Sequence, residues 1–325
     1  SAFSQLIATH PLRYYGQQAL ARLNELDRDY ANQMVASLRD DSAGLGLRLA
    51  QRPELKSSEF ERAIELMRVG EPTMALEELE ALGCFRPTAD DDQYLLAAAL
   101  LQEFGAEGQA TTLARRRVAK VLNRAPKGTA LALWRVVFPR AFRPLIDDVA
   151  RQFGLPPAFV RAIAREESSF DPNAVSPANA YGLIQLIRST AKAFGKPLGL
   201  PSDPASLKKP DVNLRIGANF MRSLFERYKG NSALVPAAYN AGPGAADRWL
   251  RERPNVDLDE WIETIPYTET RRYTRRVLQS YGVYSWLDEG RIPPLVKRLP
   301  RNEPPPTSAG DPISVAPAGL PVPGA

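Results

Sequence analysis

Helical spacing of apolar residues is the feature that most restricts the fold of the first 139 residues. Short amphipathic patterns broken by Gly, Pro and Asp follow one another there, and no strand-like alternation persists. In the segment FERAIELMRVGEPTMALEELEAL, apolar residues recur at intervals of three and four: Ile64, Met67, Met74, Leu76, Leu79 and Leu82. Gly70 to Pro72 form the expected turn. This pattern predicts a helix hairpin in an irregular helical array without a strict repeat period.

A second region begins near residue 139, where another helical pattern ends at Gly154. Gly suits the end of a helix, and Pro156 or Pro157 suits the first turn of the next one. We therefore expect a helical array over residues 1–138, a second domain over 139–290 and a tail over 291–325. Residues 302–325 are rich in Pro and Gly and poor in aromatic residues, so we expect this segment to be disordered.

Composition supports a packed globular chain and excludes several kinds of chemistry. The 325 residues are 44% hydrophobic, and no apolar run approaches the roughly 20 residues of a transmembrane helix. The start of the chain lacks the pattern of a secretion signal, so the chain is expected to be soluble, and either cytoplasmic or already processed. Cys84 and His10 are the only residues of their types. We therefore expect no intrachain disulfide and no zinc site built from His and Cys. Ser-His-Asp triads and Cys-His dyads are not expected either, because the sequence lacks the partners they need. No calcium-loop pattern such as an EF-hand is present.

A modest positive charge gives little support for nucleic-acid binding. The 42 Lys and Arg against 37 Asp and Glu give a formal net charge of +5. Two basic clusters, residues 115–117 and Arg271, Arg272, Arg275 and Arg276, lie in helical patterns without interleaved aromatic residues. We interpret both clusters as solvated helix faces and expect no nucleic-acid partner.

One carboxylate is distinguished by its place on the helix predicted for PPAFVRAIAREESSF. At about 100° per residue, Glu167 lies in the middle of an apolar stripe formed by Val160, Ile163 and Ala164. Glu166 lies at the edge of this stripe, and we expect it not to reach the bond that Glu167 would protonate. Arg161 and Arg165 fall on the opposite, solvent-facing side. Burial of Glu167 would raise its pKa, as a general acid requires. The alternative is that this last helical turn already opens to solvent.

Two further segments have the composition of a ligand site. SSFDPNAVSPANAYGLIQL is a long run of turn-forming residues between two apolar elements, and long ordered loops are usually functional. In PAAYNAGPGAADRWL, one helix ends and another begins, with Tyr239 and Asn240 expected to be exposed at the break. An aromatic ring beside an amide suits a sugar that carries an N-acetyl group.

At these residues the sequence resembles the family 1 lytic transglycosylases. Three motifs carry the resemblance in order: AIAREESSFDPNAVSPANAYGLIQL, the Ala-Tyr-Asn-Ala-Gly box in AAYNAGPG, and WIETIPYTETRRYTRRVL. The resemblance implies a mainly α fold, in which a superhelix-like array precedes a lysozyme-like α(+β) catalytic domain. HPLRYYGQQALARL is similar to later helices of the family's superhelix, so the chain is expected to be a fragment or a short member.

The resemblance also implies roles for single residues. Glu167, followed by Ser168, falls on the catalytic acid, and substrate-binding roles fall on Ser176, Gln185, Tyr239, Asn240, Glu263 and Tyr273. Without the resemblance, Ser176 would be interpreted as a turn cap, Gln185 as a helix-surface residue and Glu263 as a surface acid. Tyr239 and Tyr273 would be interpreted as core aromatic residues. Departures from the family pattern are Asn179 for Gly, Ile184 for Met, and Ile187 and Arg188 for Met-Pro. Asn179 is still compatible with a left-handed backbone.

The implied reaction uses one carboxylate where glycoside cleavage ordinarily uses two, and it is expected to need neither a metal nor a cofactor. Glu167 would cleave the bond between N-acetylmuramic acid and N-acetylglucosamine in peptidoglycan and leave a 1,6-anhydromuramyl end. One alternative is a lysozyme-like hydrolase with Asp171 or Glu263 as the second carboxylate. The other is a noncatalytic scaffold that binds glycan. The resemblance further implies a place in the periplasm or cell envelope, a signal peptide removed upstream, and cell-wall protein partners for the helical region.

Overall fold

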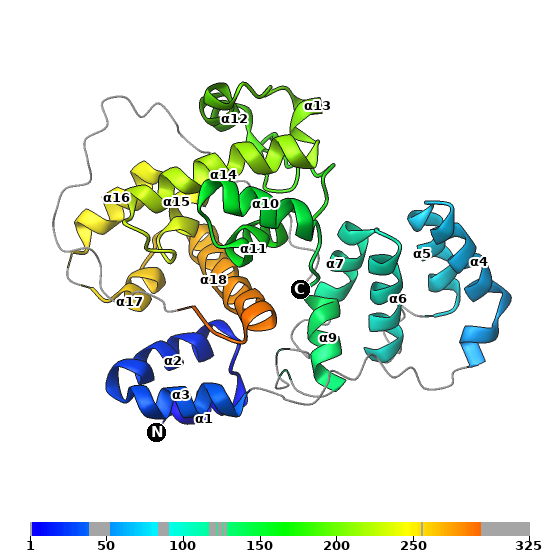
Figure 1. The fold of residues 1–325 in the computed structure, drawn as a ribbon, viewed down its shortest axis with the longest axis horizontal. Helices are drawn as coiled ribbons and strands as arrows, with labels where there is room; N and C mark the ends of the chain where they lie inside the picture. Colours follow the sequence, from blue (N-terminus) through cyan, green and yellow to red (C-terminus); the bar gives the residue numbers. More distant parts are fainter. Residues whose placement is uncertain are drawn as a thin grey trace.

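The computed structural model describes residues 2–38, 53–83, 91–116, 122, 126, 129–254 and 256–293. The described chain is almost entirely helical, which confirms the mainly α fold class (Figure 1). Its first part contains α1 (Ala2–Thr9), α2 (Tyr14–Leu26), α3 (Arg28–Ser37), η1 (Pro53–Lys56), α4 (Ser58–Arg68), α5 (Pro72–Ala81), α6 (Asp91–Glu103), α7 (Glu107–Arg115) and α9 (Thr129–Val137). Its second part contains α10 (Arg143–Phe153), α11 (Pro157–Ser168), β1 (Ala180–Tyr181), β2 (Leu186–Ile187), α12 (Arg188–Gly195), η2 (Lys196–Leu198), α13 (Pro204–Leu207), α14 (Pro210–Arg227), α15 (Val235–Ala241), α16 (Pro243–Glu252), α17 (Leu258–Glu263) and α18 (Thr268–Glu289).

Helices α4 and α5 form the hairpin that the sequence predicts. Gly70 adopts a φ of 83°, and Pro72 opens α5, where its missing N–H leaves no helical bond unmade. Met67 and Leu79 are buried in the hairpin, but Met74 is 51% exposed. Both helices therefore form where the apolar spacing predicts them, with Met74 on an exposed side of α5.

The first three helices pack away from the α4–α9 array and lie beside α18 (Figure 1). The backbone N–H of Tyr14 donates to Gln279 Oε1 at 3.1 Å, and the buried Gln17 amide donates to the Gln279 carbonyl at 3.1 Å. Gly282 allows this close approach, because a Cβ there would lie 2.1 Å from Gln17 Oε1. Residues at the two ends of the described chain are thereby packed together.

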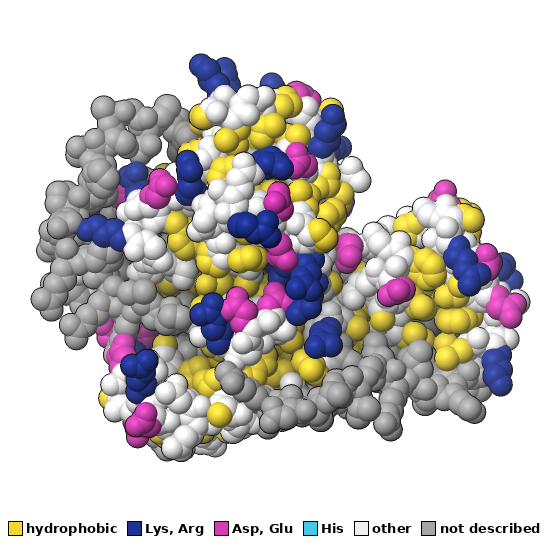
Figure 2. Space-filling view, in the orientation of Figure 1, with side chains coloured by type: hydrophobic (Ala, Val, Ile, Leu, Met, Phe, Trp, Pro, Cys, Tyr) yellow, Lys and Arg dark blue, Asp and Glu magenta, His cyan; other side chains and the backbone are white. Residues whose placement is uncertain are grey.

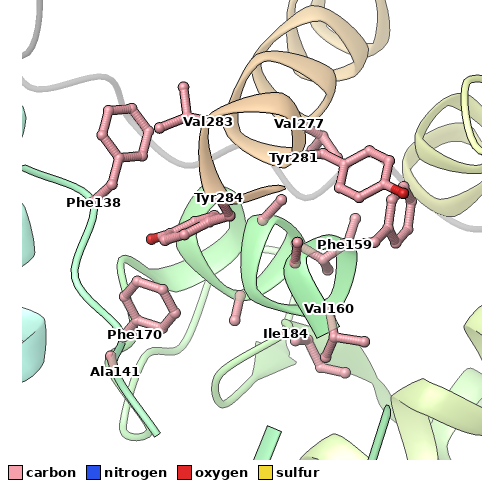
Figure 3. Close-up of a cluster of buried hydrophobic side chains, with 14 of the residues drawn as sticks. Phe138, Ala141, Phe159, Val160, Phe170, Ile184, Val277, Tyr281, Val283 and Tyr284 are labelled. Atoms are coloured by element: carbon pink, nitrogen blue, oxygen red, sulfur yellow. The ribbon is translucent and has the colours of Figure 1, made fainter. Parts of the chain in front are cut away.

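Helix α11 runs through the centre of the main core and packs along α18 (Figure 3). Phe159 meets Tyr281 edge-on with 5.3 Å between ring centroids, and Tyr284 meets Phe138 in the same way at 5.7 Å. Val160 is fully buried on the same helix. Gly154 ends α10 with a φ of 66°, as its position in the sequence predicts. The second half of α11 is consequently held on several sides.

A two-stranded hairpin follows α11 and is fastened to α14 by one side chain. Strands β1 and β2 are antiparallel, with Ala180 opposite Ile187. Asn213, which is fully buried, donates to the carbonyls of Tyr181 at 2.8 Å and Leu207 at 2.9 Å, and accepts from the N–H of Ile184 at 3.0 Å. This amide satisfies two backbone groups of the hairpin, at Tyr181 and Ile184, and the carbonyl of Leu207 at the end of α13.

Several sequence-based expectations fall on parts of the chain that the structure does not describe. Cys84 and residues 294–325 lie outside the described residues, so the disorder expected for residues 302–325 stays a prediction, as do the domain boundaries at 138 and 290. Among the residues described, no helix has the length and apolar character needed to cross a membrane. Figure 2 shows basic and acidic side chains interspersed on the face it presents.

Candidate functional site

Glu167 lies in the last turn of α11 and is buried, with only 6% of its surface exposed. The Tyr273 hydroxyl of α18 donates to Glu167 Oε1 at 2.6 Å. Burial raises the pKa of Glu167 from 4.5 to about 8; the Tyr273 hydrogen bond and Arg276 oppose this rise, and Glu166 and Glu269 add to it. Val160, Ile163 and Ala164 are fully buried, so the apolar stripe faces the core as the helical wheel predicts. Glu167 is therefore a carboxylic acid that keeps its proton near neutral pH.

Two tyrosines border this acid and remain hydroxyl donors. Burial raises the pKa of Tyr273 and of Tyr239 well above the ordinary value, and the charge of Glu167 adds to both shifts. The Tyr239 hydroxyl, on α15, donates to the Ile184 carbonyl at 2.8 Å. Tyr239 thus links α15 to the hairpin loop beside Glu167.

The expectation that Tyr239 and Asn240 are exposed is wrong. Each is only 6% exposed, because α15 packs against α18. Asn240 Oδ1 accepts a hydrogen bond from the Thr270 hydroxyl of α18 at 2.6 Å. Asn240 therefore helps to join the two helices that carry Tyr239 and Tyr273.

Ser176 and Gln185 shape the loop between α11 and the hairpin. Ser176 Oγ accepts from the N–H of Ala180 at 3.1 Å, and the Gln185 amide donates to the carbonyls of Ala174 at 3.2 Å and Gly182 at 2.9 Å. Gln185 Oε1 is buried and has no hydrogen-bond partner in the structure, so this oxygen can accept a hydrogen bond from a ligand. Asn179 has a φ of 56°, the left-handed conformation that its side chain tolerates.

Glu263 faces away from Glu167. Its carboxylate lies 3.3 Å from Arg275 Nη2 and accepts from the Tyr15 hydroxyl at 3.4 Å. Arg275 and Tyr273 are two residues apart on α18 and therefore about 200° apart around it. The structure consequently brings Tyr273 to Glu167 but places Glu263 on another side of the helix.

Glu166 is a buried ion-pair partner rather than an acid at the edge of the stripe. Its carboxylate lies 2.7 Å from Arg115 Nη2 of α7 and 3.2 Å from Arg276 Nε of α18, and the Ser280 hydroxyl donates to it at 2.7 Å. Burial by itself would raise the pKa of Glu166, but the charges of Arg115, Arg165 and Arg276 outweigh it and lower the pKa to about 2. Glu166 therefore stays ionised beside a protonated Glu167.

Arg161 and Arg165 do not face solvent, so this part of the wheel was wrong. Arg161 is 1% exposed and pairs with Asp147 at 3.0 Å and Asp288 at 2.6 Å. Arg165 is 2% exposed, and its guanidinium lies 4.2 Å from the centre of the Phe138 ring. Helix α11 is buried all round because other elements supply partners for its arginines.

The interpretation of the two basic clusters as solvated faces is right for Arg272, which is exposed, and needs correction for the members that bind other groups. Arg115 and Arg276 both bind the buried Glu166, and Arg271 donates to the carbonyl of Ile265 at 3.1 Å. Helical spacing could not identify these contacts, because Arg115 is 51 residues and Arg276 is 110 residues from Glu166 in the chain. Asn213 was missed for the same reason, since its three backbone partners come from other segments.

A cavity of about 690 Å³ lies between the array and the loop that follows α11. Leu76 and Leu113 line it from the array, and Phe170 and Asp171 line it from the loop. Glu167 does not line this cavity. Within the part of the chain that the structure describes, no group of His, Cys, Asp or Glu is arranged to hold a metal ion.

Residues 144–262, which include α11, the hairpin and the α15–α16 break, match the family described as the transglycosylase SLT domain. The chain carries an SLT domain. The soluble lytic murein transglycosylase of Escherichia coli K12 is 35% identical to the chain over 150 residues, which are 45% of this chain and 23% of the relative. The membrane-bound lytic murein transglycosylase C of Actinobacillus pleuropneumoniae serotype 5b is 33% identical over 172 residues, with 45% of this chain and 46% of the relative covered.

A solved structure extends the likeness beyond the SLT domain. An inactive glutamate-to-glutamine mutant of the lytic transglycosylase Slt from Pseudomonas aeruginosa matches with a TM-score of 0.68 and 29% identity, over 93% of this chain and 45% of the solved chain. The helices that precede the SLT domain are therefore part of the shared fold. The chain spans less than half of that protein, and its sequence match covers less than a quarter of the E. coli relative.

Proposed function

We propose that this chain is a peptidoglycan lytic transglycosylase with Glu167 as its only acid and base. The observation that carries the proposal is the state of Glu167, a buried carboxyl whose pKa is raised to about 8 and whose Oε1 accepts from Tyr273 at 2.6 Å. Such a group donates a proton at neutral pH without an external acid. The SLT domain and the lytic murein transglycosylase relatives support peptidoglycan as the substrate.

In the proposed reaction, Glu167 first protonates the glycosidic oxygen between N-acetylmuramic acid and N-acetylglucosamine. As this bond breaks, the N-acetyl group of the muramic acid stabilises the positive charge at C1. The Glu167 carboxylate then takes the proton of the C6 hydroxyl on the same sugar, and the C6 oxygen bonds to C1. The acid recovers its proton and no water is consumed. Tyr273 would orient the Glu167 carboxyl through both steps.

Ser176, Gln185, Tyr239 and Asn240 are proposed to shape the glycan site around this acid. Gln185 offers a buried acceptor oxygen without a partner, which suits a sugar hydroxyl or an acetamido N–H. Tyr273 would act on the Glu167 carboxyl through its hydrogen bond and not on the glycan. Glu263 would stabilise α18 through its ion pair with Arg275. On this proposal the protein works in the periplasm or cell envelope, and the helical region meets cell-wall proteins.

The deciding experiment is digestion of purified sacculi with the intact chain, followed by mass spectrometry of the released fragments. The expected products carry 1,6-anhydromuramyl ends. Glu167→Gln keeps the shape of the side chain but has no proton to donate, so turnover should fall at least roughly a hundredfold to ten-thousandfold. Asp171→Asn is the matched control for a hydrolase with two carboxylates, and it should still release anhydro products.

Fragments that end only in reducing muramic acid would instead identify the lysozyme-like hydrolase. Glycan binding without turnover by the wild-type chain would identify the noncatalytic scaffold. Turnover by Glu167→Gln within a few-fold of wild type would remove Glu167 as the acid.

A further inference from the structure

Glu166 joins three segments that lie far apart in the sequence. Helix α7 of the array contributes Arg115, at 2.7 Å from Glu166 Oε2, and α18 contributes Arg276 at 3.2 Å and the Ser280 hydroxyl at 2.7 Å. On α11 itself, Arg165 Nε lies 3.5 Å from Glu166 Oε1. Glu166 is only 7% exposed, whereas the side chains of Arg115 and Arg276 are 30% and 46% exposed, so the carboxylate is shielded from water more than its partners are.

Arg115 also holds the end of α11 independently of Glu166. Its Nη1 donates to the Arg165 carbonyl at 2.7 Å and to Ser169 Oγ at 3.2 Å. Ser169 ends α11 in the left-handed conformation, with a φ of 55°. The array therefore contacts the carbonyl of the residue two before Glu167 and the side chain of the residue two after it.

We propose that Glu166 is a positioning residue, which fastens α7 of the array to α11 through Arg115 and holds Arg276 in an ion pair beside Glu167. This role rests on the proposed function of Glu167 as the acid. The array thereby becomes a structural part of the active site. Glu166 itself touches no substrate in this arrangement, which agrees with its direction around the helix.

The charges around the two acids explain why the pairing matters. Glu167 faces Tyr239 of α15, Tyr273, Arg276 and Glu269 of α18, and its neighbour Glu166. Arg276 lowers the pKa of Glu167, whereas Glu166 raises it. Glu166 in turn is faced by Arg115 of α7, Arg165 of α11, and Arg276 and Tyr284 of α18. Removal of its charge would leave Arg276 without its carboxylate partner beside Glu167.

The first test is Glu166→Gln in the full chain, which removes the charge but keeps the size and an acceptor for Ser280. We expect the pKa of Glu167 to fall by about one unit, because a negative neighbour is lost and a positive one is released. A titration by NMR of protein labelled with carbon-13 at the Glu carboxyls measures this without substrate, and the Glu167→Gln spectrum assigns the signal. On sacculi, turnover should fall roughly fivefold at pH 8 and stay nearly unchanged at pH 6.

The second test is Arg115→Gln, which removes the contacts to α11 but leaves Glu166 paired with Arg276. Amide hydrogen exchange at residues 166–170 should become about tenfold faster, as expected when charged hydrogen bonds are lost. The pKa of Glu167 should not fall in this variant. A fall of the Glu167 pKa in Glu166→Gln but not in Arg115→Gln separates the effect of the Glu166 charge from a general loss of packing at the end of α11.

Arg22→Gln is the matched control. Arg22 of α2 lies 2.7 Å from Asp257 and also binds Asp259, so it too joins distant segments, but no contact links it to α11. It should change neither the Glu167 titration nor exchange at residues 166–170. If both quantities match wild type in Glu166→Gln and Arg115→Gln, the positioning role is overturned. A wild-type chain that titrates as described but releases no anhydro product contradicts the proposed function alone.

Discussion

Two adjacent glutamates on α11 occupy opposite electrostatic environments. Burial dominates at Glu167 and raises its pKa to about 8, whereas three arginines outweigh burial at Glu166 and lower its pKa to about 2. Successive residues on a helix point about 100° apart, so each carboxylate meets a different set of neighbours. One helical turn thus holds a protonated acid beside an ionised one.

Tyr273→Phe tests how the acid is held. The hydroxyl lowers the pKa of Glu167 by hydrogen bonding, so its loss should raise that pKa above about 8 and move the high-pH limb of turnover to higher pH. Turnover at neutral pH should fall roughly tenfold, because the carboxyl loses its orientation. Tyr281→Phe is the control, since Tyr281 contacts α11 through its ring against Phe159. A Tyr273→Phe profile superimposable on wild type would show that the hydrogen bond has no catalytic part.

The raised pKa of Glu167 also predicts a pH-dependent stability. The unfolded chain loses this proton near 4.5 and the folded chain near 8, so the wild type loses stability as pH rises through this interval. Gln cannot ionise and escapes the loss. The melting temperature of Glu167→Gln should therefore equal wild type near pH 4 and exceed it by at least about 2 °C at pH 8. A constant difference across this range, measured by calorimetry, would contradict the raised pKa.

At the scale of elements, α14 holds the hairpin beside the acid through Asn213. Its amide makes hydrogen bonds with the backbone of Tyr181, Ile184 and Leu207. The Ile184 carbonyl also accepts a hydrogen bond from the Tyr239 hydroxyl. The loop between α11 and the hairpin is therefore positioned from outside the loop. This arrangement makes a residue on a core helix part of the shape of the site.

Asn213→Ala should lower the free energy of unfolding by about 3 kcal/mol, because three buried backbone groups lose their partner. Urea denaturation measures this change. Asn219→Ala is the matched control on the same helix, since the Asn219 amide donates to one backbone carbonyl, that of Phe194. It should cost about 1 kcal/mol. Equal losses in the two variants would mean that the three hydrogen bonds of Asn213 contribute no more to the free energy of unfolding than the Asn219 amide does.

For the whole molecule, α18 is where distant segments of the chain meet. Helices α2, α11, α15 and α17 all pack against it, and the contact with α2 depends on Gly282. The first helices are consequently joined to α18, the last helix described, although they lie at the other end of the chain (Figure 1). Changes at this contact should affect the stability of the molecule rather than that of one helix.

Gly282→Ala should destabilise the chain by roughly 1–3 kcal/mol, because the new Cβ would lie 2.1 Å from Gln17 Oε1 and displace the Gln17 amide from its hydrogen bonds to the carbonyls of Leu12 and Gln279. Gly244→Ala on α16 is the matched control, since a Cβ there meets nothing within 4 Å. It should leave stability unchanged or raise it slightly, because Ala favours a helix more than Gly does. Thermal unfolding compares the two, and an unchanged Gly282→Ala would show that α2 is not tightly packed on α18.

Local sequence determined the helices and the direction of the acid. Gly70, Pro72 and Gly154 set helix ends through conformations and missing donors that belong to the residues themselves. The spacing of Val160 and Ile163 placed Glu167 toward the core, because a helix fixes the angle between residues on it.

Only the tertiary structure decided which polar side chains are buried and with which partners. Arg165 looked solvent-facing on an isolated helix, yet it is 2% exposed because other elements cover that side. Tyr239 and Asn240 were expected to be exposed at the break between two helices, but they are buried because α15 packs against α18. Two of the three arginines that keep Glu166 ionised come from 51 and 110 residues away. Burial of a charge requires a partner, and the position of that partner depends on the path of the whole chain rather than on local spacing.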